Sequence, residues 1–372
     1  MHGTRTNPQI AVLSILQLTG RPWTIEAHGM SDARSSTRLS PLWLGFVVSG
    51  SLLLVLIVVE TVFGRWAALT TTGEFDALAR GSTGVLRDLR IAIVHSLVAG
   101  YVSAALLFVV RNGRRTVKVL QQALNFTPEE CARLAASVRL SRRWLVIIAV
   151  VGLALALISP YLVPPVPKNP WDPSSWQPEV YWHRLLGPVV VVMQLWLGYA
   201  IVSVSLRMSR IARKLSDIDL LDLSPLGPFT QLGLTNALLL FGLLSIWSLM
   251  MIETGFGRMM VIIGGITLVF ATLALFAPVQ GVHARIRQSK TRELDWVNGE
   301  IAARRATLQD ATPARAGGEL ADLVAYRSLI DGVPEWPFTT STYARLVLYA
   351  LIPLMSWGIG VVAEEIVGRA LF

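Results

Sequence analysis

Seven stretches of about twenty predominantly apolar residues divide the chain, each separated from the next by polar or proline-rich sequence. The hydrocarbon core of a bilayer is about 30 Å thick, and a helix that rises about 1.5 Å per residue needs roughly 20 residues to cross it. The pattern therefore predicts an all-α fold, a polytopic bundle of seven transmembrane helices. The predicted spans are 42–63, 91–110, 144–164, 185–206, 233–253, 259–280 and 345–367.

Composition agrees with this assignment. The chain has 372 residues, of which 53% are hydrophobic and only 15% are charged, and its mean hydropathy is +0.55. A soluble protein carries about 25% charged residues. The low charge, together with the seven apolar stretches, excludes an ordinary soluble globular protein.

Lysine and arginine are distributed unevenly between the polar segments. The formal net charge is +9, and alternate polar segments hold 24 of the 33 basic residues while the opposite set holds 8. Basic residues concentrate in cytoplasmic loops, so we expect the N-terminus in the cytoplasm and the C-terminus outside. The richer set is the sequence before the first span, 111–143, 207–232 and 281–342, and the poorer set is 64–90, 165–184, 254–258 and the C-terminal tail.

The same distribution indicates the surroundings of the protein. Basic cytoplasmic segments face anionic lipid headgroups, so the expected partner is the lipid bilayer and not nucleic acid. The 29 arginines outnumber the 4 lysines, which is typical of a GC-rich bacterial gene. We therefore expect a multi-pass protein of the bacterial inner (plasma) membrane.

Four regions follow from these assignments. They are a cytoplasmic tail (1–41), a region of six spans (42–280), a cytoplasmic antiparallel helical hairpin of coiled-coil type (281–342), and the seventh span with the outer C-terminus (343–372). Residues 1–29 are interpreted as an over-called start or a disordered tail, because Met30 opens an ordinary bacterial beginning. The outer loop 160–182 is rich in proline and tryptophan and is interpreted as a structural cap or a lid.

Three cytoplasmic segments carry helix signals. Thr127, Pro128 and Glu130 have the spacing of a capping box with proline at the first helical position, which predicts a short helix after the second span. Arg210–Leu223 places basic and apolar residues at helical spacing and predicts an amphipathic helix on the inner membrane surface. In the hairpin, we expect the chain to leave span six as a helix, turn within Gln309–Gly318 and return as a second helix.

Sequence motifs for catalysis are missing. The chain contains no phosphate-binding glycine loop, no dinucleotide fingerprint, no zinc-protease motif and no nucleophile elbow. Its five histidines fall on both sides of the predicted membrane, and Cys131 is the only cysteine. We therefore expect neither an enzyme nor a bound cofactor or metal.

Ionisable residues within spans are costly in lipid and are functional candidates for that reason. With the assigned orientation, Glu60, His95 and Glu364 all fall in the outer third of the membrane. They are expected to line an acidic outer vestibule that concentrates cations or protons. For His95, a histidine satisfied between two helices is the alternative. Glu253 and Arg258 flank a short outer turn and are interpreted as a structural pair.

Small and polar residues mark the predicted helix contacts. Gln194, Gly198 and Ser205 share one face of span four and form a polar seam toward a partner helix or a pore. The runs Gly100–Ala104 and Gly152–Ala156 have small residues four positions apart, which predicts close approach of neighbouring helices.

Span seven contains a candidate helix break. Pro353 disturbs the helix, and Gly358 and Gly360 follow within two turns. A broken helix exposes backbone dipoles at membrane depth, where transport sites often form. A kink that serves packing alone is the alternative.

Two functions fit these features. The first is a homo-oligomeric channel or transporter-like protein for cations or protons, with the acidic outer vestibule as its site. The alternative is a membrane sensor or scaffold that recruits a cytoplasmic protein partner through the 281–342 hairpin. An intramembrane enzyme acting on lipid ranks last, because no nucleophile–base pair is evident.

Overall fold

The chain divides into two units, Met1–Leu39 and Ser40–Phe372, and every residue described by the computed structural model belongs to the second. The described residues are 40–62, 84–123, 126–162, 171–172, 178–215, 218–251, 258–308 and 313–371. Their regular structure is entirely helical, so the predicted all-α class is confirmed. The predictions for residues 1–29 and for most of the outer loop 160–182 lie outside the described residues.

Seven of the described helices are long and apolar enough to cross a membrane. They correspond to the seven predicted spans. The helices are α2 (Pro41–Val62), α5 (Gly84–Ala123), α6 (Pro128–Ser137), α7 (Arg142–Leu162), α8 (Pro178–Ala212), α9 (Gly227–Ser248), α10 (Arg258–Leu308), α11 (Pro313–Asp331) and α12 (Thr340–Leu371), with short 3-10 turns η2 (Ser224–Leu226) and η3 (Leu249–Met251).

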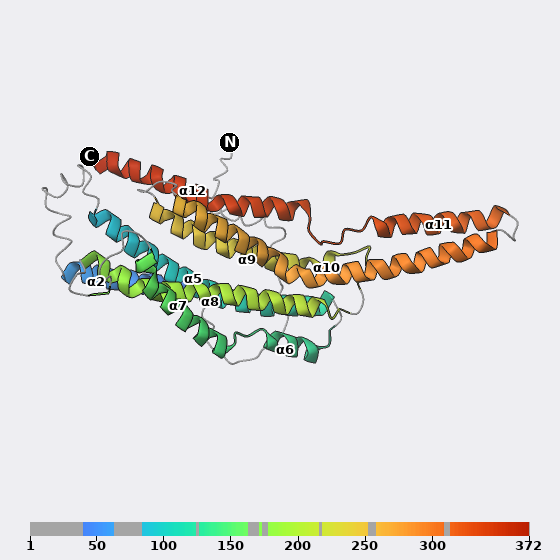
Figure 1. The fold of residues 1–372 in the computed structure, drawn as a ribbon, viewed down its shortest axis with the longest axis horizontal. Helices are drawn as coiled ribbons and strands as arrows, with labels where there is room; N and C mark the ends of the chain where they lie inside the picture. The colour runs from blue at the N-terminus through green and yellow to red at the C-terminus, as the bar shows by residue number, and fades with distance from the viewer. Residues whose placement is uncertain are drawn as a thin grey trace, which may run out of the picture. The chain divides into compact units, whose positions relative to one another are not determined.

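The long helices run in alternating directions, so that α5 and α8 finish at the end of the bundle where α9 begins, and α7 runs back in the opposite direction (Figure 1). We call this the basic end of the bundle, because the described arginines and lysines concentrate beyond it. Helices α5, α8, α9 and α10 pack against one another, whereas α2, α7 and α12 pack mainly on α5, α8 and α9 respectively. Only 11% of the apolar window of each peripheral helix is buried, against 56% for α9. The peripheral helices therefore present wide apolar faces.

The small-residue runs predicted to allow close packing do so. A β-carbon at Gly100 would overlap the Ser49 side chain in α2, and one at Gly45 would lie 3.0 Å from the Ala104 β-carbon. Gly152 in α7 faces α8, where an added β-carbon would lie 3.0 Å from Leu195. Small side chains at these positions let the backbones approach and gain packing contacts.

Two further crossings were not predicted. In α9, a β-carbon at Gly233 would collide with the Leu275 carbonyl oxygen of α10. In α10, a β-carbon at Gly281 would collide with the Ser209 carbonyl oxygen of α8. Because the opposing atoms belong to the backbone, neither neighbour can move aside by changing a rotamer. Glycine is therefore required at both crossings.

The predicted capping box is confirmed at α6. The Glu130 amide donates to the Thr127 hydroxyl at 3.2 Å, and the Thr127 amide donates to the Glu130 carboxylate at 3.1 Å. The amphipathic helix predicted for Arg210–Leu223 is wrong, because α8 ends at Ala212. The Asp219 and Asp222 carboxylates accept the backbone amides two residues on, which stabilises turns in competition with a helix.

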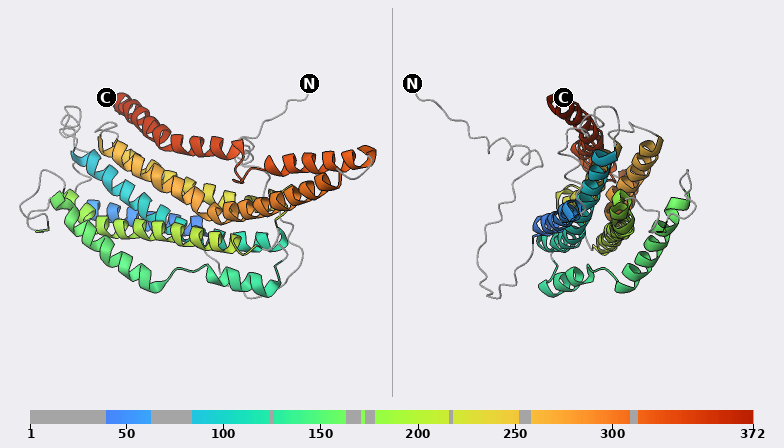
Figure 2. Two further views of the ribbon diagram at one scale, coloured as in Figure 1. Left: turned by 45° about the vertical axis from the view of Figure 1, so that its right-hand side comes forward. Right: turned by 90° about the vertical axis from the view of Figure 1, so that its left-hand side faces the viewer.

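The predicted helical hairpin is formed by α10 and α11, which lie side by side beyond the basic end (Figure 2). Helix α10 continues without interruption through 51 residues, from the bundle into the hairpin. The predicted turn is too long, since α11 begins at Pro313 and includes Gly317 and Gly318. Proline is favourable in the first turn of a helix, because a backbone N–H at that position has no hydrogen-bond acceptor within the helix.

The predicted break in α12 is a bend within one continuous helix. Pro353 and Gly358 both lie inside Thr340–Leu371, which is helical throughout. Figure 2 shows α12 changing direction partway along its length. Proline removes one backbone hydrogen bond and displaces the preceding turn, which bends a helix without ending it.

Candidate functional site

His95 is enclosed by protein. Its side chain is 1% exposed, and its ring meets the Trp247 ring of α9 edge-on, with the centroids 5.4 Å apart. The His95 ring therefore contacts a neighbouring helix. The side chains of Glu60 and Glu364, the other two vestibule candidates, lie outside the described residues.

The other predicted site residues are described only in part. Glu253 and the side chains of Arg258 and Gly360 lie outside the described residues, so the predicted outer pair stays a prediction. Gly358 faces open space, since an added β-carbon there would meet no atom within 4 Å. Pro353 is buried.

The predicted polar seam of α8 consists of Gln194, Gly198 and Ser205. Of these three residues, Ser205 is seen to contact another helix. Ser205 is fully buried and accepts a hydrogen bond from Asn236 Nδ2 of α9 at 3.1 Å. Gln194 Nε2 and Asn236 Oδ1 are buried, and neither has a hydrogen-bond partner among the described residues. Gly198 has open space where a side chain would be. Sequence reasoning missed Asn236, although a polar residue in span five was the available signal.

The hairpin joins the bundle through a cluster of aromatic rings. The His283 ring of α10 stacks on the Trp336 ring with centroids 4.0 Å apart and planes within 5° of parallel. Phe276, two turns earlier on α10, meets Trp336 edge-on at 5.3 Å and Phe338 edge-on at 5.1 Å. Tyr343 of α12 extends the cluster, with its ring 5.8 Å from that of Phe338. We call these five residues the hairpin junction.

Three hydrogen-bonding side chains hold the connecting segment 332–339 at this junction. Lys290 Nζ donates to the carbonyl oxygens of Asp331 at 2.6 Å and Val333 at 2.9 Å, where α11 ends. Thr230 of α9 donates to the Pro337 carbonyl at 3.1 Å. His283 Nδ1 lies 3.1 Å from the Glu335 carbonyl oxygen, which can only accept, so the proton resides on Nδ1. The segment is therefore tied to both α9 and α10.

Polar contacts then continue along the hairpin. The Tyr326 hydroxyl of α11 donates to the Glu293 carboxylate of α10 at 2.9 Å, and this bond raises the pKa of Tyr326. Arg327 Nε donates to the Asn298 side chain at 2.8 Å. Arg304 and Glu319 form an ion pair at 2.5 Å nearer the tip. These contacts set the register between α10 and α11 along the hairpin.

An apolar groove of about 520 Å³ lies at the base of the hairpin. Leu221 and Leu329 on its walls are 65% and 61% exposed. Its lining comes from the segment after α8 and from the end of α11, and consists of Leu220, Leu221, Leu223, Ser328, Leu329, Gly332, Val333 and Pro334. Leucine side chains that are exposed outside the apolar part of the bundle can bind apolar side chains of a partner protein.

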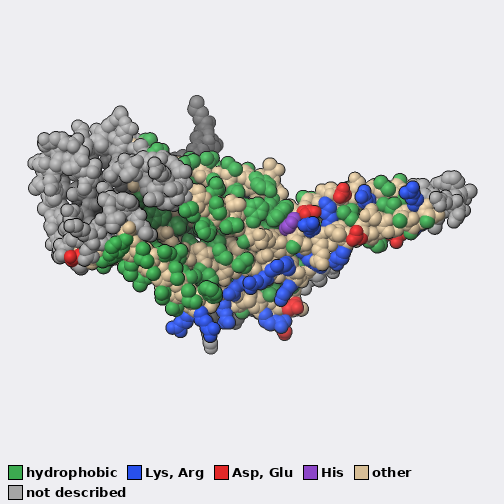
Figure 3. Space-filling model, in the orientation of Figure 1, with side chains coloured by type: hydrophobic (Ala, Val, Ile, Leu, Met, Phe, Trp, Pro, Cys, Tyr) green, Lys and Arg blue, Asp and Glu red, His purple; other side chains and the backbone are tan. Residues whose placement is uncertain are grey.

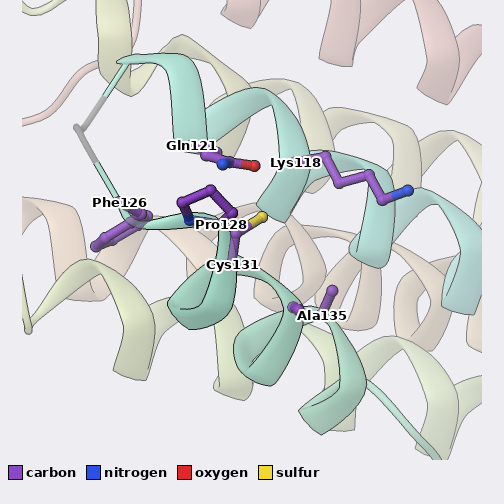
Figure 4. Close-up of a pocket in the computed structure, with 7 residues that line it drawn as sticks. Lys118, Gln121, Phe126, Pro128, Cys131 and Ala135 are labelled. Carbon is purple, nitrogen blue, oxygen red and sulfur yellow. The ribbon is translucent and has the colours of Figure 1, made fainter. Parts of the chain in front are cut away.

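A second hollow of about 750 Å³ lies between the end of α5 and α6 (Figure 4). Figure 4 shows Lys118 and Gln121 on α5 and Cys131 and Ala135 on α6 around it. Cys131 is buried, and its sulfur lies 3.8 Å from the Val117 carbonyl oxygen. Among the described lining residues, Lys118 is the one that carries a charge.

The described residues show no group of three or more histidine, cysteine, aspartate or glutamate side chains that could hold a metal ion. Figure 3 shows lysine and arginine side chains gathered where the apolar surface of the bundle gives way to α10 and α11. No protein-family model, curated protein or solved structure matches this chain.

Proposed function

We propose that this protein is a docking platform in a bacterial inner membrane, which spans the bilayer seven times and holds its helical hairpin in the cytoplasm to recruit a protein partner. Wide apolar faces on α2, α7 and α12 support the membrane placement, because surfaces of this kind need a non-aqueous neighbour. The concentration of basic residues beyond one end supports a cytoplasmic position for that end.

One observation carries the docking role. The hairpin is anchored at its base by the hairpin junction, and its first helix continues unbroken from the bundle. An element built only to connect two spans needs neither the ring cluster nor the bonds from Lys290 and Thr230. A fixed hairpin with an exposed apolar groove at its base presents a preorganised surface, which lowers the entropy cost of binding.

The groove predicts where the partner binds. Replacing Leu329 by serine should weaken capture of the partner by about tenfold, because an apolar anchor in a groove contributes roughly 1–2 kcal/mol. The measurement is quantitative mass spectrometry of cytoplasmic proteins retained by the purified full chain. Val324→Ser is the matched control, since Val324 lies on the same helix, is 51% exposed and does not line the groove.

Other outcomes of this capture experiment would argue against the groove. Equal retention by wild type, Leu329→Ser and Val324→Ser would remove the groove as the docking surface. Loss of retention in both variants would show a general effect of polar substitution on α11. Unchanged elution of both variants on size exclusion establishes that folding is intact.

A second candidate function is transport of cations or protons, and it is supported by a buried polar atom without a hydrogen-bond partner in each of α8 and α9. Polar groups at membrane depth are costly without a partner and are functional candidates for that reason. Gln194 Nε2 and Asn236 Oδ1 are of this kind within the described chain. The acidic outer vestibule of Glu60, His95 and Glu364 belongs to this proposal.

A measurement of cation or proton flux distinguishes the two proposed functions. If the protein transports cations or protons, proteoliposomes should show flux that falls in Glu60→Gln, His95→Ala or Glu364→Gln. The docking proposal expects no flux above that of protein-free liposomes. A flux that is present and unchanged in all three variants would eliminate the vestibule as its path.

A further inference from the structure

Two helices bring their basic ends together at the crossing of α8 and α10. The backbones touch where Gly281 meets the Ser209 carbonyl, so positions within about two turns of this point on either helix lie near the crossing. Helix α8 and the turn after it supply four cations, and α10 supplies two within two turns. We call this set the cationic crossing: Arg207, Arg210, Arg213, Lys214, Arg285 and Arg287.

Several charges of the cationic crossing are exposed to a ligand. Arg210, Arg213 and Arg287 are exposed, and no carboxylate of the described chain forms an ion pair with them. Arg285 is positioned by the protein, since its Nε donates to the Leu215 carbonyl at 2.6 Å. That bond fixes a guanidinium of α10 beside the end of α8.

Acidic residues near the cationic crossing are engaged in their own turns. The Asp219 carboxylate accepts the Leu221 amide at 2.9 Å, and the Asp222 carboxylate accepts the Ser224 amide at 3.0 Å. The hydrogen bonds from Ser224 keep the pKa of Asp222 below its usual value. Asp217 lies outside the described residues. Six cations therefore outnumber the three carboxylates of the following segment.

The positions of these cations along their helices indicate which layer of the membrane they would reach. The apolar sequence of α8 ends at 206 and that of α10 at about 282. At about 1.5 Å per residue, Arg210 and Arg285 lie roughly 5–6 Å beyond the apolar part of their helices. The headgroup region of a bilayer is roughly 5–7 Å thick on each side. In the proposed membrane placement, these side chains reach the phosphates of the leaflet.

We propose that the cationic crossing is a binding site for an anionic phospholipid, and that a lipid with two phosphates, of the cardiolipin type, fits it best. Guanidinium groups bind phosphate through paired N–H donors. Because the cations come from two helices, two phosphates can be bound at once without crowding on one helix. Basic clusters between transmembrane helices bind such headgroups in general. The site rests on the membrane placement and not on the docking role.

A charge-matched control distinguishes this site from a general attraction to anionic lipid. Arg142 and Arg143 are also exposed, but both belong to the first turn of the single peripheral helix α7. Changing Arg142 and Arg143 to glutamine removes the same charge as Arg210→Gln with Arg213→Gln. Only the second pair of substitutions removes cations from the cationic crossing.

The test is native mass spectrometry of the purified full chain titrated with cardiolipin, phosphatidylglycerol, phosphatidylcholine or inorganic phosphate. We expect retained cardiolipin, weaker binding of phosphatidylglycerol, and no retention of phosphatidylcholine or inorganic phosphate. The Arg210→Gln and Arg213→Gln double variant should bind cardiolipin about thirtyfold more weakly, because each of the two cations near an anionic headgroup contributes roughly 1 kcal/mol. The α7 double variant should change by less than about twofold.

Other outcomes overturn the proposal. Equal losses in the two double variants would show non-specific attraction, and tight retention of inorganic phosphate would assign the site to a free anion. An Arg210→Lys and Arg213→Lys variant keeps the charge but loses the paired guanidinium donors, so its affinity for cardiolipin should lie between those of the wild type and the glutamine variant. If the lysine variant binds as poorly as the glutamine variant while both elute normally on size exclusion, a phosphate-binding role is contradicted.

Discussion

Replacing Gly281 by leucine should prevent the bundle from assembling. The β-carbon alone would overlap the Ser209 carbonyl oxygen, and the remaining side-chain atoms require α8 and α10 to separate. Overpacking in a closely packed interior costs about 1–3 kcal/mol even where side chains can adjust, and backbone cannot adjust in that way. We expect a loss of about 3 kcal/mol or more, seen as aggregation on size exclusion and a lower thermal unfolding temperature in detergent.

Gly265 provides the matched control for this substitution. It lies on the same helix, and a β-carbon there would meet no atom within 4 Å. Gly265→Leu should therefore elute and unfold like the wild type. If Gly281→Leu behaves like Gly265→Leu, then α8 and α10 do not cross in backbone contact, and the cationic crossing loses its basis.

Replacing Trp336 by alanine should loosen the connecting segment 332–339 and the end of α11, while the bundle itself stays folded. The substitution removes the stack on His283 and the contacts with Phe276 and Phe338. Aromatic pairs contribute roughly 0.5–1.5 kcal/mol each beyond the area they bury, so three pairs amount to about 3 kcal/mol. Hydrogen exchange should accelerate over 332–339 and leave α5 and α9 protected.

Trp296→Ala is the control for this effect. Trp296 lies on the hairpin part of α10 and is 53% exposed. Its removal should leave exchange at the hairpin junction unchanged. Partner capture should fall in Trp336→Ala although Leu221 and Leu329 are intact, because docking depends on a positioned groove. Normal exchange and capture in Trp336→Ala would show that the hairpin is held by other contacts.

Features local in sequence were predictable. The capping box at Thr127 and Glu130 needs only the spacing of two residues, and it forms as expected. The seven apolar helices follow from length and hydropathy in the same way. The helix predicted for Arg210–Leu223 failed because hydrophobic spacing alone ignored the two aspartates that favour turns.

Features that depend on distant segments were not predictable. Nothing near Trp336 in sequence identifies His283 as its stacking partner, 53 residues earlier. The contact between Gly281 and Ser209 is of the same kind, although a glycine inside a helix carries a cost of about 1 kcal/mol and so signals a packing role. His95 was placed at the correct helix, but its burial against Trp247 depends on the packing of α5 on α9.

In the proposed membrane placement, the basic end and the hairpin face the cytoplasm. Changing Cys131 to serine leaves a cysteine-free chain, in which Val324→Cys marks the hairpin and Ser174→Cys marks the sequence assigned to the outer side. A membrane-impermeant maleimide applied to intact spheroplasts tests the orientation directly. We expect Ser174→Cys to be labelled at once and Val324→Cys to be labelled only after the membrane is permeabilised. Labelling of Val324→Cys in intact spheroplasts, with Ser174→Cys protected, would contradict it.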